Sequence, residues 1–200
     1  MSQRREVRRT RPARVRVAGR CFFAFAVELT AALRRASRRL RATGLFKATS
    51  GDVWCDEVLN RALEGVKGTT AVHICFGYAA IIHERPSGYS FLPEFAEAPV
   101  DQVSIETAQS SLDCSILRKL RGKTIILGVL DLSTHQVETP EIVAGRIRRA
   151  LPFVSLDRLV VAPDCGMKYL PRDIAFRKLQ AMVEGAKLVR EDYRARGTAR

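Results

Sequence analysis

The sequence predicts an α/β fold organised around a parallel β-sheet, and three observations favour this fold class. From residue 52 onward, short apolar runs alternate with segments of helical character in the order β-α-β-α-β-α-β-α. The apolar runs are continuous, which is typical of strands that are buried on both faces of a parallel sheet. The chain of 200 residues is long enough for one domain with a sizeable hydrophobic core.

The predicted strands share runs of apolar and β-branched residues, and they are residues 69–76, 101–106, 124–130 and 158–162. The predicted helices precede or follow these strands, and they are residues 56–64, 107–120 and 140–150 and a last helix that opens at Pro171. Thr139 is a good N-cap for the helix at 140–150, because Pro140 fits the first helical position. Residues 83–90 contain Pro86 and Gly88 and are predicted to form a loop.

Four β/α units are too few to close a barrel. They amount to half of a (β/α)8 barrel, a fold that needs about 250 residues in its complete form. Residues 51–200 contain no internal repeat, no Gly-rich phosphate loop and no low-complexity tract. We therefore expect a partial (β/α)8 TIM barrel over residues 51–200.

Residues 1–50 differ in composition from the rest and are expected to form a basic N-terminal arm. They hold 14 lysines and arginines against two acidic residues, whereas residues 51–200 hold 20 basic and 19 acidic residues. The formal net charge of +13 therefore belongs almost wholly to the arm, and the predicted domain is nearly neutral. We expect residues 1–20 to be poorly ordered and residues 21–43 to be helical.

The five cysteines, at irregular spacing, make a poor disulfide framework and favour a reducing compartment. No apolar run approaches the roughly 20 residues that span a bilayer, so we expect a cytoplasmic protein with no membrane partner. An Arg-rich, acid-poor N-terminus also fits a transit peptide or an export signal. Glu28 interrupts the apolar run at residues 21–27, and no small-residue cleavage site is present, which counts against export.

Four side chains of metal-binding type fall at the carboxyl ends of the predicted strands. His73 and Cys75 lie two residues apart near the end of the first strand, and residues i and i+2 of a strand point to the same side. Glu106 ends the second strand, and Cys165 follows the fourth. In barrels and open α/β folds, active sites form at that edge of the sheet.

Two thiolates, an imidazole and a carboxylate suit zinc, which accepts all three ligand types in tetrahedral geometry. Glu106 is the most easily exchanged of the four, so it could give way to a substrate thiol, which loses its proton on binding zinc. The alternative is an ordinary structural role, with the cysteines as small apolar residues, the histidine in the core and the glutamate as a helix cap. The coincidence of four ligand types from three strands favours the metal site, and the spacing leaves both interpretations open.

Five segments carry a resemblance to a known family, and they are residues 72–77 (VHICFG), 103–108 (VSIETA), 127–131 (LGVLD), 137–141 (VETPE) and 161–168 (VAPDCGMK). With them, residues 59–193, roughly two-thirds of the chain, resemble the C-terminal catalytic domain of cobalamin-independent methionine synthase, in particular its shorter, single-barrel members. In that family the HxC pair, the glutamate of ETxxS and the cysteine of PDCG bind zinc. The resemblance therefore implies zinc ligation by the four residues at His73, Cys75, Glu106 and Cys165.

The resemblance implies methyl transfer as the reaction. Zinc holds homocysteine as its thiolate, which attacks the N5-methyl carbon of 5-methyltetrahydrofolate or a related donor and gives methionine and tetrahydrofolate. The departing folate nitrogen needs a proton, which calls for a general acid. In the long members of the family a histidine supplies it, and the matching position here is Ser133. His135, two residues further on, is the candidate substitute.

The resemblance fades before about Cys55, and residues 1–50 hold none of the further β/α units of a complete member, including an Asp-Glu-Pro motif that grips the substrate amine. We therefore expect roughly the last four units of a barrel, whose open strand edges lead to an oligomer or require a complementing half. The alternative function is a truncated, catalytically inactive zinc-binding fragment. Nucleic-acid binding through the arm is a third hypothesis, weakened by the lack of aromatic residues among its arginines.

Overall fold

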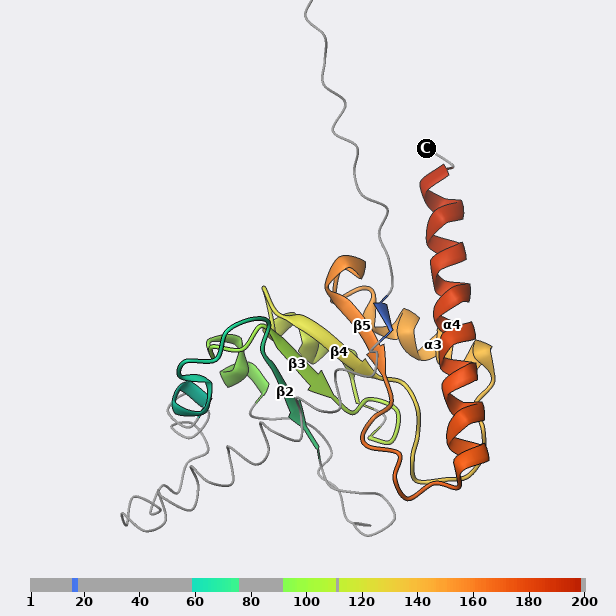
Figure 1. Ribbon diagram of the computed structural model, residues 1–200. Coiled ribbons are helices and arrows are strands. Elements are labelled where there is room, and N and C mark those ends of the chain that lie inside the picture. The colour runs from blue at the N-terminus through green and yellow to red at the C-terminus, as the bar shows by residue number, and fades with distance from the viewer. Residues whose placement is uncertain (1–15, 18–58, 76–91, 111, 199–200) are drawn as a thin grey trace, which may run out of the picture.

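A parallel β-sheet forms the centre of the fold in the computed structural model, which describes residues 16–17, 59–75, 92–110 and 112–198 (Figure 1). The strands are β1 Arg16–Val17, β2 Ala71–Ile74, β3 Gln102–Ile105, β4 Thr124–Gly128 and β5 Leu159–Ala162. Their spatial order is β1-β5-β4-β3-β2, and every neighbouring pair is parallel. From β2 to β5 the spatial order follows the chain, as in successive units of a β/α barrel. The predicted α/β class is therefore confirmed.

Helices and single turns connect these strands. Their bounds are η1 Leu92–Ala96, η2 Cys114–Lys119, α3 Pro140–Ala150, η3 Leu156–Arg158 and α4 Arg172–Thr198, and residues 59–63 are also helical. Helix α3 begins as predicted, because the hydroxyl of Thr139 accepts the backbone N–H of Ile142. Among the helices that the structure describes, none combines the length and the apolar character needed to cross a bilayer. The predictions for residues 56–58 and 83–90 and for nearly all of residues 1–50 lie outside the described residues.

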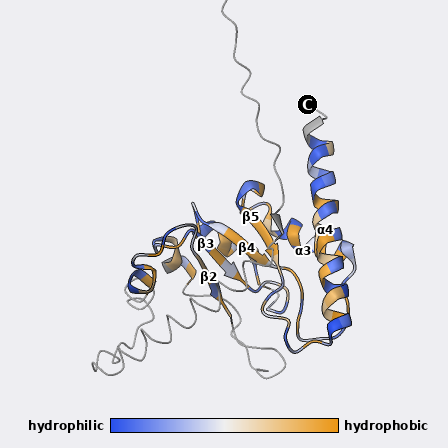
Figure 2. Cartoon of the chain, viewed as in Figure 1, coloured by the Kyte–Doolittle hydropathy of each residue, from blue (hydrophilic) through white to orange (hydrophobic). Residues whose placement is uncertain are grey.

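The pairing register divides the strand residues between two faces of the sheet. Alternate residues on one face join α3 and α4 in the main core, and they are Val72, Val103, Ile105, Ile125, Leu127, Leu159 and Val161. The opposite face carries a row that runs from His73 through Ser104 and Ile126 to Val160, one residue from each of β2 to β5. Figure 2 shows the apolar colour along the strands, and apolar and polar colours mixed along α4. His73 therefore points away from the helical layer, toward what would be the inside of a barrel.

The two residues of β1 extend the sheet beyond β5, with Arg16 aligned with Val160 and Val17 with Val161. The edge of β5 is thus covered at these positions, contrary to the expectation of an open edge. The inner face is not bare either, because Ile126 is fully buried and Ala162 is 5% exposed.

The predicted helix over residues 107–120 is wrong. Three successive backbone N–H groups at its start converge on the carboxylate of Asp164, which bends the chain there. Asp113 then caps a separate helical turn, since its carboxylate accepts the N–H of Ser115 at 2.9 Å, and only η2 follows. A tertiary partner and a second cap therefore override the helical periodicity of this segment.

Two glycines allow close approach of neighbouring elements. A Cβ at Gly128 of β4 would collide with Oδ1 of Asp164 and lie 2.9 Å from the carbonyl oxygen of Ile105. A Cβ at Gly185 of α4 would lie 2.7 Å from the carbonyl oxygen of Pro140 in α3. Any larger residue would push apart the strand ends in the first case and the two helices in the second.

A buried ionic network fastens α4 to the loop that follows β4. The side chain of Lys178 is fully buried, and its Nζ donates to Glu138 Oε2 at 2.9 Å and to the carbonyl oxygens of Asp131 and Gln136. Arg146 of α3 donates to the other oxygen of Glu138 at 2.9 Å. Burial opposes ionisation of Glu138, but the donors that face it outweigh burial and lower its pKa. The three acceptors around Nζ of Lys178 account for all three protons of its ammonium group.

Replacing Glu138 is expected to destabilise the fold in a pH-dependent way. Glu138→Gln should lower the free energy of unfolding by about 3 kcal/mol or more at pH 7, because it leaves Lys178 buried without a countercharge. The lowered pKa means that this contribution is complete above the carboxyl's ordinary value of 4.5 and is lost as the pH falls through the folded value. Urea unfolding at several pH values should show the gap between wild type and Glu138→Gln closing in acid. Asp192→Asn, which breaks only an exposed pair with Arg148, should cost less than about 1 kcal/mol, and equal losses for both variants would contradict the prediction.

The close contact at Gly128 gives a second test of the packing. Gly128→Ala should lower the free energy of unfolding by about 1–3 kcal/mol, because the new methyl group overpacks the strand ends. Gly145→Ala, in the middle of α3 with open space around its Cβ position, should raise it by about 0.5–1 kcal/mol through helix propensity. Thermal and urea unfolding of both variants would check the opposite signs.

Candidate metal centre

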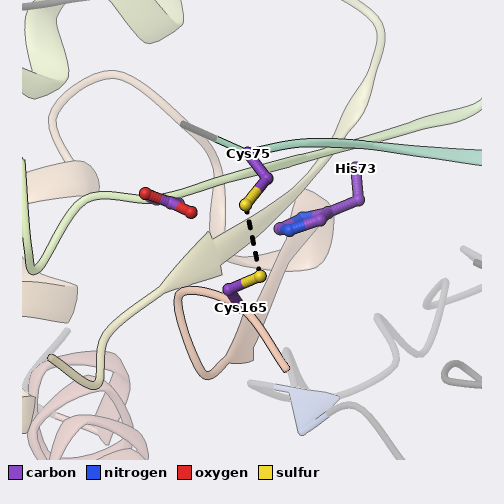
Figure 3. Close-up of side chains that lie close together, drawn as sticks. His73, Cys75 and Cys165 are labelled. Carbon is purple, nitrogen blue, oxygen red and sulfur yellow. Dashed lines mark hydrogen bonds between the residues drawn. The ribbon is translucent and has the colours of Figure 1, made fainter. Parts of the chain in front are cut away.

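The four side chains predicted to bind zinc come together at the carboxyl ends of the strands. One candidate ligand atom from each of His73, Cys75, Glu106 and Cys165 lies within 4.8 Å of all the others. Figure 3 shows the imidazole and the two sulfurs facing one another. The two Sγ atoms are 3.2 Å apart. The strand-end spacing therefore predicted the correct neighbours, and their binding of a metal stays a prediction.

The sheet register explains why these residues meet. His73 is aligned with Ser104 of β3, so both side chains stand next to each other on the inner face. Cys75 and Glu106 directly follow the last residues of β2 and β3, which are themselves aligned partners. Cys165 reaches the same place from the segment that follows β5. Three parallel strands thus contribute ligand types to a single point.

The imidazole of His73 is held through one nitrogen. Its Nδ1 lies 2.9 Å from the hydroxyl oxygen of Ser104, and its Nε2 is buried with no hydrogen-bond partner among the described residues. Metal-binding histidines usually have one ring nitrogen on the metal and the other on a polar partner. The arrangement of His73 therefore fits a metal ligand. Ser104 was not predicted for this role, although a polar residue inside an apolar strand, two positions before Glu106, was a usable signal.

The two thiols share a hydrogen bond that sets their acidities apart. The bond to Cys165, together with partial desolvation of the thiol, raises the pKa of Cys75 to about 11. The bond from Cys75 lowers the pKa of Cys165, and the backbone N–H of Gly166 adds to this effect against the opposing effect of burial. The pair therefore favours a thiolate on Cys165 and a thiol on Cys75, and a bound cation would take the place of the proton between them.

A fully buried carboxylate, that of Asp164, directly precedes Cys165 in the chain. Asp164 Oδ2 accepts the backbone N–H groups of Ala108 at 3.1 Å and Gln109 at 2.7 Å, and Oδ1 lies 3.4 Å from the N–H of Thr107. Burial raises the pKa of Asp164 to about 6, against the lowering effect of these donors. The hydroxyl of Thr107 also donates to the carbonyl oxygen of Gly128 at 2.6 Å. The loop after β3 is therefore fixed to the ends of both β4 and β5.

The structure leaves the other predicted site residue outside the cluster. His135 is exposed in the loop between β4 and α3. In the same loop, the N–H and hydroxyl of Ser133 both donate to Asp131, at 2.8 and 2.6 Å. Cys114 is buried in η2 and is likewise separate from the four clustered residues. The role of His135 as a proton donor stays a prediction.

Comparison with known proteins finds one enzyme family, both by its family model and by individual relatives. The family described as the catalytic domain of cobalamin-independent synthase matches residues 64–188. Methionine synthase of Saccharolobus solfataricus is 37% identical over 147 residues, which cover 72% of this chain and 41% of the relative. Methionine synthase of Thermococcus kodakarensis is 36% identical over 143 residues, which cover 70% of this chain and 40% of the relative.

A solved structure supports the same assignment. The B12-independent methionine synthase from Shewanella sp. W3-18-1, in complex with selenomethionine, superposes with a TM-score of 0.63 and 34% sequence identity. The superposition covers 69% of this chain and 43% of that chain, so this chain spans about two fifths of the length of its relatives.

The fold similarity confirms the partial TIM barrel predicted from the order of strands. The matched residues 64–188 are more than half of the chain and contain all four clustered side chains. The chain therefore belongs to the cobalamin-independent synthase catalytic-domain family.

Proposed function

We propose that this chain carries the metal-binding part of a methyltransferase that moves a methyl group from 5-methyltetrahydrofolate, or a related donor, to the thiol of homocysteine. The convergence of an imidazole, two thiols and a carboxylate within 4.8 Å carries the proposal. Relatives described as methionine synthases, at 36–37% identity over this part of the chain, support the reaction class.

The donor set fits zinc better than other metals. Thiolates and imidazole are soft and borderline ligands, and zinc takes them with carboxylate in tetrahedral sites. The buried Nε2 of His73 gives independent support, because a cation would satisfy it. Zinc bound here would supply one thing, the stabilisation of the homocysteine thiolate at neutral pH. Within this proposal Glu106 is the ligand that is exchanged for the substrate thiol.

The residues around the cluster would shape the site for that chemistry. Ser104 fixes the ring of His73, and the full burial of Glu106 keeps water from one side of the cluster. Cys75 is exposed, so a thiol substrate would approach from its side. His135 is proposed as the proton donor to the leaving folate nitrogen, and the buried Lys178 anchors its loop at Asp131 and Gln136.

A second candidate function is zinc binding without turnover. The relatives are more than twice as long as the matched segment, so groups that they supply from elsewhere have no counterpart within it.

We propose that a polypeptide carrying the other β/α units completes the site and packs on α4. An apolar stripe on α4 supports this: Phe176, Leu179 and Val183 are 61%, 38% and 48% exposed and, at 3.6 residues per turn, lie opposite Gly185, where α3 packs.

Zinc content is the first expected outcome. Elemental analysis of the purified chain should find about one zinc per chain. Cys75→Ser and Cys165→Ser should each remove it, because each loses a thiolate ligand, whereas Cys114→Ser should keep it. Glu106→Gln should weaken binding less than either thiolate loss. Equal zinc retention in all of the cysteine variants would refute the site.

The reaction itself is tested by methionine formation from homocysteine and 5-methyltetrahydrofolate with the zinc-loaded chain. Turnover would support the methyltransferase, and His135→Ala should then lower the rate by about 10²–10⁴-fold, as expected for a lost general acid. Ser133→Ala is the matched control in the same loop and should leave the rate nearly unchanged. Zinc binding with no methionine formed, alone or with added partner chain, would favour the second candidate.

A further inference from the structure

We propose that Asp164 is a positioning residue of the metal centre, which sets the separation of Glu106 and Cys165 without being a ligand itself. The inference rests on the proposed function, since it concerns the same site. Asp164 would act on the ligands through the backbone that carries them, and not by contact with the metal.

The hydrogen bonds of Asp164 show why it is not itself a donor to the metal. Its side chain is fully buried, and both carboxylate oxygens accept backbone N–H groups: Oδ1 from Ala108 at 3.2 Å, and Oδ2 from Ala108 at 3.1 Å and from Gln109 at 2.7 Å. The oxygens thus point into the loop after β3, and Asp164 is not one of the four clustered residues. A carboxylate that accepts several N–H groups is strongly held in one orientation.

The position of Asp164 in the chain makes it a link between two ligands. It directly precedes Cys165, and the N–H groups that it accepts begin at Thr107, directly after Glu106. These ligands follow β5 and β3, which are not neighbours, because β4 lies between them. Two such strands are about 9.5 Å apart, so ladder pairing alone does not bring their ends together.

Gly128 makes the link geometrically feasible. It lies in β4 between the two strand ends, and a Cβ there would collide with Oδ1 of Asp164. Without a side chain at this position, the carboxylate crosses over β4 and reaches the backbone after β3. The three strand ends are thereby held at one separation, which is the separation that the four donors need.

The test measures zinc affinity of the full chain by competition with a chelator, under conditions where circular dichroism shows the variant folded. Asp164→Asn keeps the side chain's shape but turns one acceptor into a donor. Zinc affinity should fall by about 10–100-fold, the usual effect of losing a group that orients metal ligands. The visible absorption of the Co²⁺-loaded chain should also change, because the ligand geometry changes.

Asp101→Asn is the matched control. Asp101 Oδ2 accepts the N–H and hydroxyl of Thr70 at 2.7 and 2.9 Å, so it also links two strands, but at their amino ends. A purely structural carboxylate of this kind should alter unfolding and leave zinc affinity within about twofold of wild type.

The outcomes separate this inference from the proposed function. Failure of the wild-type chain to bind zinc would refute the proposed function and the inference together. Wild-type zinc binding with unchanged affinity and Co²⁺ spectrum in Asp164→Asn would overturn the inference alone. If Asp164→Asn does not fold, Gly128→Ala decides, because its new Cβ would collide with Oδ1 of the same carboxylate and displace it. A several-fold loss of affinity would then support the positioning role, and an unchanged affinity would overturn it.

Discussion

The carboxylate of Asp164 is the constraint on which the rest of the described structure depends. Burying a charged group is costly, and three backbone N–H groups offset that cost. Because these N–H groups are bound to Asp164, the chain after β3 does not continue into the helix that its apolar spacing favours. The requirement for glycine at position 128 is a consequence of the same contact.

The helical layer is held by a second buried charge, that of Lys178. Lys178 reaches the loop after β4 and meets Glu138, which also accepts from Arg146 of α3. Both attachments lie at the carboxyl ends of the strands, where the four clustered side chains converge. The sheet therefore supplies the register, and buried charges fix the loops that the register alone leaves undetermined.

Features encoded locally were predictable from the sequence. The apolar runs gave all four main strands, and the Thr139–Pro140 pair gave the start of α3. The four clustered donors followed from one rule, that parallel strands end at a common edge. Features that depend on distant partners were not predictable: the segment after Glu106 has helical spacing but takes its conformation from Asp164, and Lys178 would ordinarily be placed at the surface. The residue that orients His73 required the register between β2 and β3, which no single strand specifies.

The length of α4 has a consequence of its own. A helix of 27 residues extends about 40 Å, whereas strands of four or five residues extend only about 13–17 Å, so its C-terminal turns continue past the sheet (Figure 1). Val189 is the last buried residue of α4 up to residue 196, where the description of burial ends, and beyond Val189 the helix relies in part on exposed ion pairs such as Arg148–Asp192. Amide protection should therefore decline steeply along these turns, and proteases should trim them first. The tail of α4 can fray and reform while the strand ends that carry the four clustered side chains, some turns away, keep their shape.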